Sequence, residues 1–152
     1  MPKLYPNPPY KGACLCGAVR LSITAPPFLT AACHCLDCQK LTASAFSMTT
    51  MFPAEGVEIT GPLTLGALKT PGRAHYYCAS CLGFVYSQLD AAAWRVNVRT
   101  MALDQAERFP PFLEVMTVDS LAWVKLPVRH SFETVPGSAE ELRGIMQEFA
   151  AG

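Results

Sequence analysis

The chain has 152 residues, of which 51% are hydrophobic and 16% charged, so it carries enough apolar side chain to fill the core of one domain of ordinary size. Twelve basic and twelve acidic residues cancel, and the basic residues lie scattered from Lys3 to Arg143, which excludes a nucleic-acid binder that depends on a basic patch. No run approaches the ~20 apolar residues of a membrane span, and residues 1–9 contain no signal-peptide core. We therefore expect a cytoplasmic protein, in whose reducing compartment closely spaced cysteines hold metals rather than form disulfides.

Thirteen prolines and ten glycines divide the chain into short segments, a pattern that predicts a mainly β fold in a single domain over residues 1–152. The proline-rich residues 1–9 are expected to form an extended arm. Candidate strands alternate or are rich in β-branched and aromatic side chains, and they lie at 19–23, 46–52, 57–59, 74–77, 84–87, 94–98 and 114–124, with a rigid loop at 109–112.

One helix is predicted, at residues 138–150. Ser138 followed by Glu141 is a capping box, which satisfies the first free amide groups of a helix. Four apolar residues then recur at helical spacing and are expected to pack against the sheet: Leu142, Ile145, Met146 and Phe149.

The seven cysteines fall into three groups. These are Cys14-x-Cys16, Cys33-x-Cys35-x-x-Cys38 and Cys78-x-x-Cys81. Two pairs supply the four thiolates of a closed structural zinc site, and the triplet supplies three, which leaves a position open to water or substrate as in catalytic zinc sites. Spacing leaves open which groups share the closed site; we favour Cys14, Cys16, Cys78 and Cys81 because the triplet is locally complete. Two Zn²⁺ per chain are expected, zinc being the commoner structural ion in all-thiolate sites.

Two simpler interpretations of the cysteines compete with parts of this hypothesis. Cysteines also serve as small buried apolar residues, but seven in three tight groups do not fit that use. The triplet could instead hold a second structural zinc closed by another ligand, and His34 is the nearest candidate. In extended backbone, however, His34 points away from its two cysteine neighbours. His75 and His130 are expected to be ordinary strand or loop residues.

The segments that carry these cysteines resemble a known family. Gly12-Ala13-Cys14-Leu15-Cys16-Gly17-Ala18-Val19 resembles the opening motif of the glutathione-dependent formaldehyde-activating enzymes, a family that includes centromere protein V-like domains. The run from Cys33 to Lys40, with Ser44 after it, resembles the second motif, and Cys78-Ala79-Ser80-Cys81 the third. The segment from Val118 to Pro127 is similar to the family's C-terminal strand.

The resemblance implies an Mss4-like fold of curled antiparallel sheets around two zinc sites. It implies a structural zinc on Cys14, Cys16, Cys78 and Cys81, and a second, catalytic zinc on Cys33, Cys35 and Cys38. The activity it implies is the condensation of formaldehyde with glutathione to S-hydroxymethylglutathione, a carbon–sulfur lyase reaction in reverse. The chain departs from the family pattern at Leu82, which precedes Gly83, and at Gln39, which replaces a basic residue and is followed by Lys40.

A zinc enzyme acting on a thiol or an aldehyde is therefore the leading hypothesis, because an open zinc position binds a thiolate or polarises a carbonyl. Lys40 and Ser44 are candidates to orient the substrate, although a solvated surface side chain explains Lys40 better. The alternative is a non-enzymatic Mss4-like zinc module that binds a protein partner, which an enclosed second zinc would favour. A methionine sulfoxide reductase is excluded because no cysteine follows Cys81.

Overall fold

The computed structural model describes residues 3–66 and 70–152, and this part of the chain contains eleven strands in two sheets and two α-helices. The smaller sheet has the order β1-β2-β5 and consists of Tyr10–Ala13, Arg20–Ile23 and Val57–Thr60. The larger sheet has the order β11-β10-β3-β4-β9-β8-β7-β6. In chain order its strands are β3 (Leu29–Cys33), β4 (Ser47–Pro53), β6 (Leu63–Leu65), β7 (Arg73–Cys78), β8 (Phe84–Leu89), β9 (Arg95–Arg99), β10 (Leu113–Val115) and β11 (His130–Ser131).

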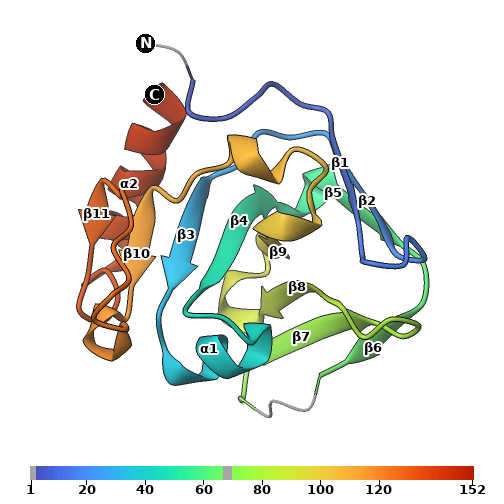
Figure 1. Cartoon of the computed structure of the whole chain (residues 1–152). Coiled ribbons are helices and arrows are strands. Elements are labelled where there is room, and N and C mark those ends of the chain that lie inside the picture. The colour runs from blue at the N-terminus through green and yellow to red at the C-terminus, as the bar shows by residue number, and fades with distance from the viewer. Residues whose placement is uncertain (1–2, 67–69) are drawn as a thin grey trace.

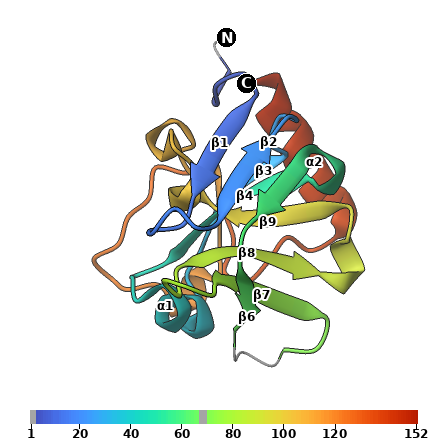
Figure 2. The same ribbon diagram turned by 90° about the vertical axis from the view of Figure 1, so that its right-hand side faces the viewer.

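The core lies where the small sheet packs against the large one. Figure 2 shows β1 and β2 lying over β4 and β9, and the Tyr10 and Phe52 rings of β1 and β4 are 5.7 Å apart. Alternation decides which side chains enter this core: Leu21 and Ile23 of β2 are buried and Arg20 and Ser22 are exposed. Both sheets thus bury one apolar face, as the alternation in the sequence predicts.

The helix α2 (Ala139–Ala151) confirms the prediction for the C-terminus. The Ser138 hydroxyl accepts a bond of 3.1 Å from the Glu141 amide, and the Glu141 carboxylate accepts one of 2.6 Å from the Gly137 amide. The helix covers the β10–β11 end of the large sheet (Figure 1). Its Phe149 is buried and stacks on Tyr5 of the N-terminal segment with ring centroids 5.0 Å apart.

The strand expected at 114–124 is shorter than predicted. Strand β10 ends at Val115, because Met116 adopts a left-handed backbone conformation (φ 58°) and starts a 3₁₀ turn at Thr117–Asp119. The segment that follows is exposed, with Trp123 at 76% of its maximum accessibility. Strand β10 also pairs in parallel with both β3 and β11, so the larger sheet is mixed rather than antiparallel throughout.

The helix α1 (Leu36–Thr42) was not predicted, and neither were strands β1, β3, β6 and β11. Helix α1 has no buried residue and therefore no apolar stripe, which is the signal that reveals a helix in a sequence. Strand β3 has the opposite problem, since it is buried along nearly its whole length and shows no alternation. The mainly β class is confirmed.

Candidate metal centres

The first cluster joins two chain turns that are distant in sequence. The sulfurs of Cys14, Cys16, Cys78 and Cys81 all lie within 4.8 Å of one another. Two separations, 3.6 Å between Cys14 and Cys16 and 3.8 Å between Cys16 and Cys78, match the ~3.8 Å expected between thiolates on one tetrahedral zinc with Zn–S bonds of ~2.3 Å. The donor set therefore fits a four-thiolate metal site.

Backbone amides support the sulfurs of this cluster. The Val19 amide donates to Cys14 Sγ at 3.3 Å, and the Ser80 amide donates to Cys78 Sγ at 3.4 Å. Amides of Cys16 and Gly83 lower the pKa of Cys81, because N–H donors stabilise a thiolate. The turns thus help Cys81 to carry negative charge, as metal ligands must.

The departure at Leu82 has a local structural consequence. The Leu82 amide donates to the Cys78 carbonyl at 2.9 Å and the Cys78 amide donates to the Gly83 carbonyl at 3.0 Å, so the turn closes tightly around the pair of cysteines. Closure puts Leu82 in the left-handed region (φ 57°), a conformation that costs a leucine roughly 1–2 kcal/mol. The extra residue therefore reshapes the turn without removing a sulfur from the cluster.

The second cluster is formed by the junction of β3 and α1. Cys33 ends the strand, Cys35 is the residue before the helix, and Cys38 lies in the first helical turn. The Cys38 amide donates to Cys35 Sγ at 3.4 Å, so a cysteine thiol takes the capping role that serine or aspartate usually fills. The three sulfurs lie within 4.8 Å of one another and all three side chains are only partly buried.

Charge is distributed unevenly within the triplet. A hydrogen bond from the Cys33 thiol, with help from the Ser47 hydroxyl, Cys35 and the positive charge of Arg99, lowers the pKa of Cys38 to about 5. The same bond to Cys38, together with burial, raises the pKa of Cys33. Without a metal, Cys38 is therefore the thiolate of the group and Cys33 the thiol.

The histidine between the ligands does not join the cluster. His34 is buried, and its Nε2 lies 2.8 Å from Glu114 Oε2 on β10. Gln39, which replaces the basic residue of the family pattern, donates to the carbonyls of His34 (2.6 Å) and Asp119 (3.0 Å). Gln39 therefore ties α1 to the turn after β10. Lys40 and Ser44 are exposed.

Arg99 is the residue that sequence reasoning missed. It pairs with Thr49 across β9 and β4, donates to the hydroxyls of Thr49 and Ser87, and lies with its guanidinium carbon 4.4 Å from the centre of the Phe84 ring. The available signal was the run Arg95-Val96-Asn97-Val98-Arg99, whose alternation puts two arginines on the face opposite the buried valines. Only the register of the strands shows that this face of β9 lies next to the triplet.

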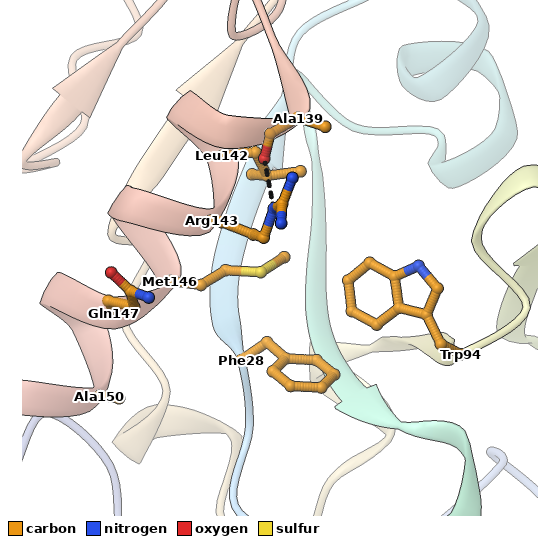
Figure 3. Close-up of a pocket in the computed structure, with 8 residues that line it drawn as sticks. All are labelled: Phe28, Trp94, Ala139, Leu142, Arg143, Met146, Gln147 and Ala150. Carbon is orange, nitrogen blue, oxygen red and sulfur yellow. Dashed lines mark hydrogen bonds between the residues drawn. The ribbon is translucent and has the colours of Figure 1, made fainter.

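A separate apolar pocket lies beside α2. It has a volume of about 620 Å³, and Figure 3 shows Phe28 and Trp94 across from Leu142 and Met146 of the helix. Its lining contains no thiol and no carboxylate, so it offers none of the groups that thiol or aldehyde chemistry requires. In the part of the chain that the structure describes, no helix is long and apolar enough to cross a membrane.

The fold and the two clusters define a class: a small, mainly β protein with two groups of cysteines that could hold metal ions. Residues 9–119 match the profile of the family described as glutathione-dependent formaldehyde-activating enzyme. Because this match covers most of the chain, the protein belongs to that family.

One solved structure adds evidence on the fold. It is that of a Rhodobacter sphaeroides protein, a Northeast Structural Genomics target, which aligns with a TM-score of 0.52 and 21% identity over 62% of this chain and 87% of that chain. At this level of identity the likeness shows the fold alone. No curated protein sequence matched the chain.

Proposed function

We propose that the protein is a zinc-dependent enzyme of the carbon–sulfur lyase type that condenses formaldehyde with a small thiol, glutathione being the first candidate. The observation that carries this proposal is the contrast between a cluster of four sulfurs and a cluster of three within a chain of this family. Four thiolates complete a tetrahedral zinc, whereas three leave a position for a substrate atom.

In this proposal Cys14, Cys16, Cys78 and Cys81 hold a structural zinc, and the triplet Cys33, Cys35 and Cys38 holds the catalytic one. A zinc ion at the triplet would supply a Lewis acid for the carbonyl oxygen and lower the pKa of a bound thiol. The seven free cysteines fit a reducing compartment, and we place the protein in the cytoplasm.

The reaction needs no oxidant or reductant. The thiol sulfur forms a bond to the carbonyl carbon, the C=O π pair moves onto the oxygen, and the thiol proton ends on that oxygen to give the hydroxymethyl thioether. The chain's own contribution is to favour one anionic sulfur in the triplet: the bond from Cys33, the Ser47 hydroxyl and the Arg99 charge all favour the Cys38 thiolate. Exposed Lys40 and Ser44, at and just beyond the end of α1, remain candidates to orient the substrate.

The alternative function is a non-enzymatic zinc module that binds a protein partner. That reading requires no access to the second metal, whereas all three triplet cysteines are partly exposed. Accessibility to a small molecule therefore favours the enzyme.

The test combines metal content with exchange kinetics. Elemental analysis should find close to two zinc ions per chain. NMR exchange spectroscopy at equilibrium should show the wild type accelerating exchange between formaldehyde and glutathione above the rate in buffer, and Cys35→Ser should abolish the acceleration while retaining the fold. Equal rates for wild type, variant and buffer would contradict the glutathione–formaldehyde assignment.

A further inference from the structure

A strip of polar side chains crosses four strands of the large sheet next to the triplet. On β9 the residues Arg95, Asn97 and Arg99 alternate with buried valines and share one face. Register continues that face onto the neighbouring strands, because Arg99 pairs with Thr49, Asn97 with Ser87, and Ser87 with His75. We call this set the basic strip; it consists of Thr49, His75, Ser87, Arg95, Asn97 and Arg99.

The positive charge of the basic strip is not balanced by a carboxylate among the described residues; the negative charge that favours charged Arg99 is the Cys38 thiolate of the triplet. Among residues 3–66 and 70–152, neither Arg95 nor Arg99 forms an ion pair with a carboxylate. Arg99 is held by two hydroxyls and an aromatic ring, and Arg95 by the sulfur of Met51 and the Trp94 ring. Burial lowers the pKa of both arginines, which records the cost of keeping these charges away from water.

Several polar atoms of the strip are buried without a partner. His75 is only 6% exposed, and within the described part of the chain neither of its ring nitrogens has a hydrogen-bond partner. The same holds for the Nε atoms of Arg95 and Arg99 and for Oδ1 of Asn97. Buried polar groups in native proteins are nearly always paired, and a polar ligand beside the triplet would supply partners that the protein's own contacts do not.

The strip adjoins the triplet through the register of β3, β4 and β9. Cys33 pairs with Ser47, and Thr49, two residues further along β4, pairs with Arg99. With strands ~4.8 Å apart and a rise of ~3.3 Å per residue, the Cα atoms of Cys33 and Arg99 are about 12 Å apart. A thiol bound by its sulfur at the triplet therefore needs only a few bonds to reach the Arg99 side chain.

We propose that the basic strip is the anion subsite of the thiol substrate, and hence that the enzyme selects thiols that carry a carboxylate. The Arg99 guanidinium is a planar fork that suits a carboxylate, and Thr49 and Ser87 orient it. Asn97 and His75 offer further polar atoms beside it. This inference rests on the proposed function, because it assumes that the thiol reacts at the triplet.

The experiment uses two thiols that differ only in charge, N-acetylcysteine and its neutral amide. Exchange with formaldehyde is measured for the zinc-loaded wild type, Arg99→Gln and Arg99→Lys, with Arg108→Gln as control, since Arg108 is an exposed arginine outside the strip. We expect the wild type to favour N-acetylcysteine by about tenfold or more, as a charged hydrogen bond allows, and Arg99→Gln to lose most of that preference. Arg99→Lys should retain part of it, and Arg108→Gln all of it.

A binding measurement separates failure of this inference from failure of the proposed function. S-methylglutathione keeps the carboxylates and has no free thiol, so its affinity, measured by NMR titration, reports the strip alone. Arg99→Gln, compared with the wild type at matched zinc content, should weaken it about tenfold or more. If the wild type accelerates neither thiol, the proposed function fails and this titration still decides the subsite.

Equal acceleration of both thiols by the wild type would overturn the inference and leave the function standing. Unchanged S-methylglutathione affinity in Arg99→Gln would also overturn it, and loss of the second zinc from that variant would then assign Arg99 to the metal cluster. Should Arg99→Gln not fold, Thr49→Val removes a hydroxyl that orients the guanidinium and should show the same loss on a smaller scale.

Discussion

The two cysteine clusters differ in how the chain brings their sulfurs together. The four-cysteine cluster joins turns more than sixty residues apart, one before β2 and one after β7, so it exists only when two sheets are in place. The triplet spans six residues at one strand–helix junction. Closing a long loop removes much conformational freedom from the unfolded chain, so a metal in the first cluster is coupled to folding far more strongly than one in the second.

The clusters also differ in their electrical surroundings. The four-cysteine cluster is supported by backbone amides of its own turns. The triplet has a backbone donor in the Cys38 amide, and it also receives the side-chain charge of Arg99 and the hydroxyl of Ser47, both from other strands of the large sheet. Backbone support suits a permanent structural ion. Side-chain support can be tuned by substitution, as expected of a reaction centre.

The comparison is tested most severely by serine substitutions in each cluster. Cys81→Ser should give insoluble or unfolded protein, because metal binding to a closed thiolate site contributes on the order of 10 kcal/mol to folding. Cys35→Ser should give a folded protein that lacks one zinc. Circular dichroism with elemental analysis measures both outcomes. If Cys35→Ser unfolds as readily as Cys81→Ser, the division into a structural and a reactive site is wrong.

The pH at which Cys38 of the triplet ionises tests the difference in electrostatic surroundings between the two clusters. In protein whose triplet has been depleted of metal, the pKa of Cys38 falls from 9.0 to about 5, chiefly through the bond from Cys33. Between these values the folded state binds fewer protons than the unfolded state, so the thiolate's stabilising contribution is present above pH 9 and is lost as the pH falls through about 5. Alkylation of Cys38 by iodoacetamide, mapped by mass spectrometry, should therefore be half-maximal near pH 5.

Arg99→Gln provides the control for that titration. It removes a positive charge that favours the thiolate and should move the midpoint to higher pH. A wild-type midpoint near 9, with no response to Arg99→Gln, would show that the neighbours of Cys38 do not lower its pKa.

The smallest effect concerns the turns of the four-cysteine cluster. Leu82→Gly should stabilise the protein by about 0.5–1 kcal/mol, since relief of the left-handed strain exceeds the added freedom of glycine in the unfolded chain. Leu15→Gly is the matched control, an exposed leucine in the other turn whose φ is not positive, and it should destabilise by about 0.4–1 kcal/mol. Thermal unfolding measures both; a shift in the same direction for the two variants would contradict the strain argument.

Local patterns in the sequence were sufficient for several features. The spacing of the cysteines divided them into three groups, and the structure brings the sulfurs of the favoured combination, the first group with the third, together. The capping box at Ser138 and the apolar stripe ending at Phe149 placed α2, because both signals act within a few residues of chain. Alternation located β2 and β9 for the same reason.

What the sequence by itself determined is therefore what neighbouring residues decide among themselves: the mainly β class, the C-terminal helix and the grouping of the cysteines. Only the tertiary structure decided which distant groups meet. Strand register put Arg99 beside the triplet, and the parallel pairing of β10 with β3 brought Glu114 to His34. Such contacts depend on the relative position of strands far apart in the chain, and a local periodicity carries no information about that position.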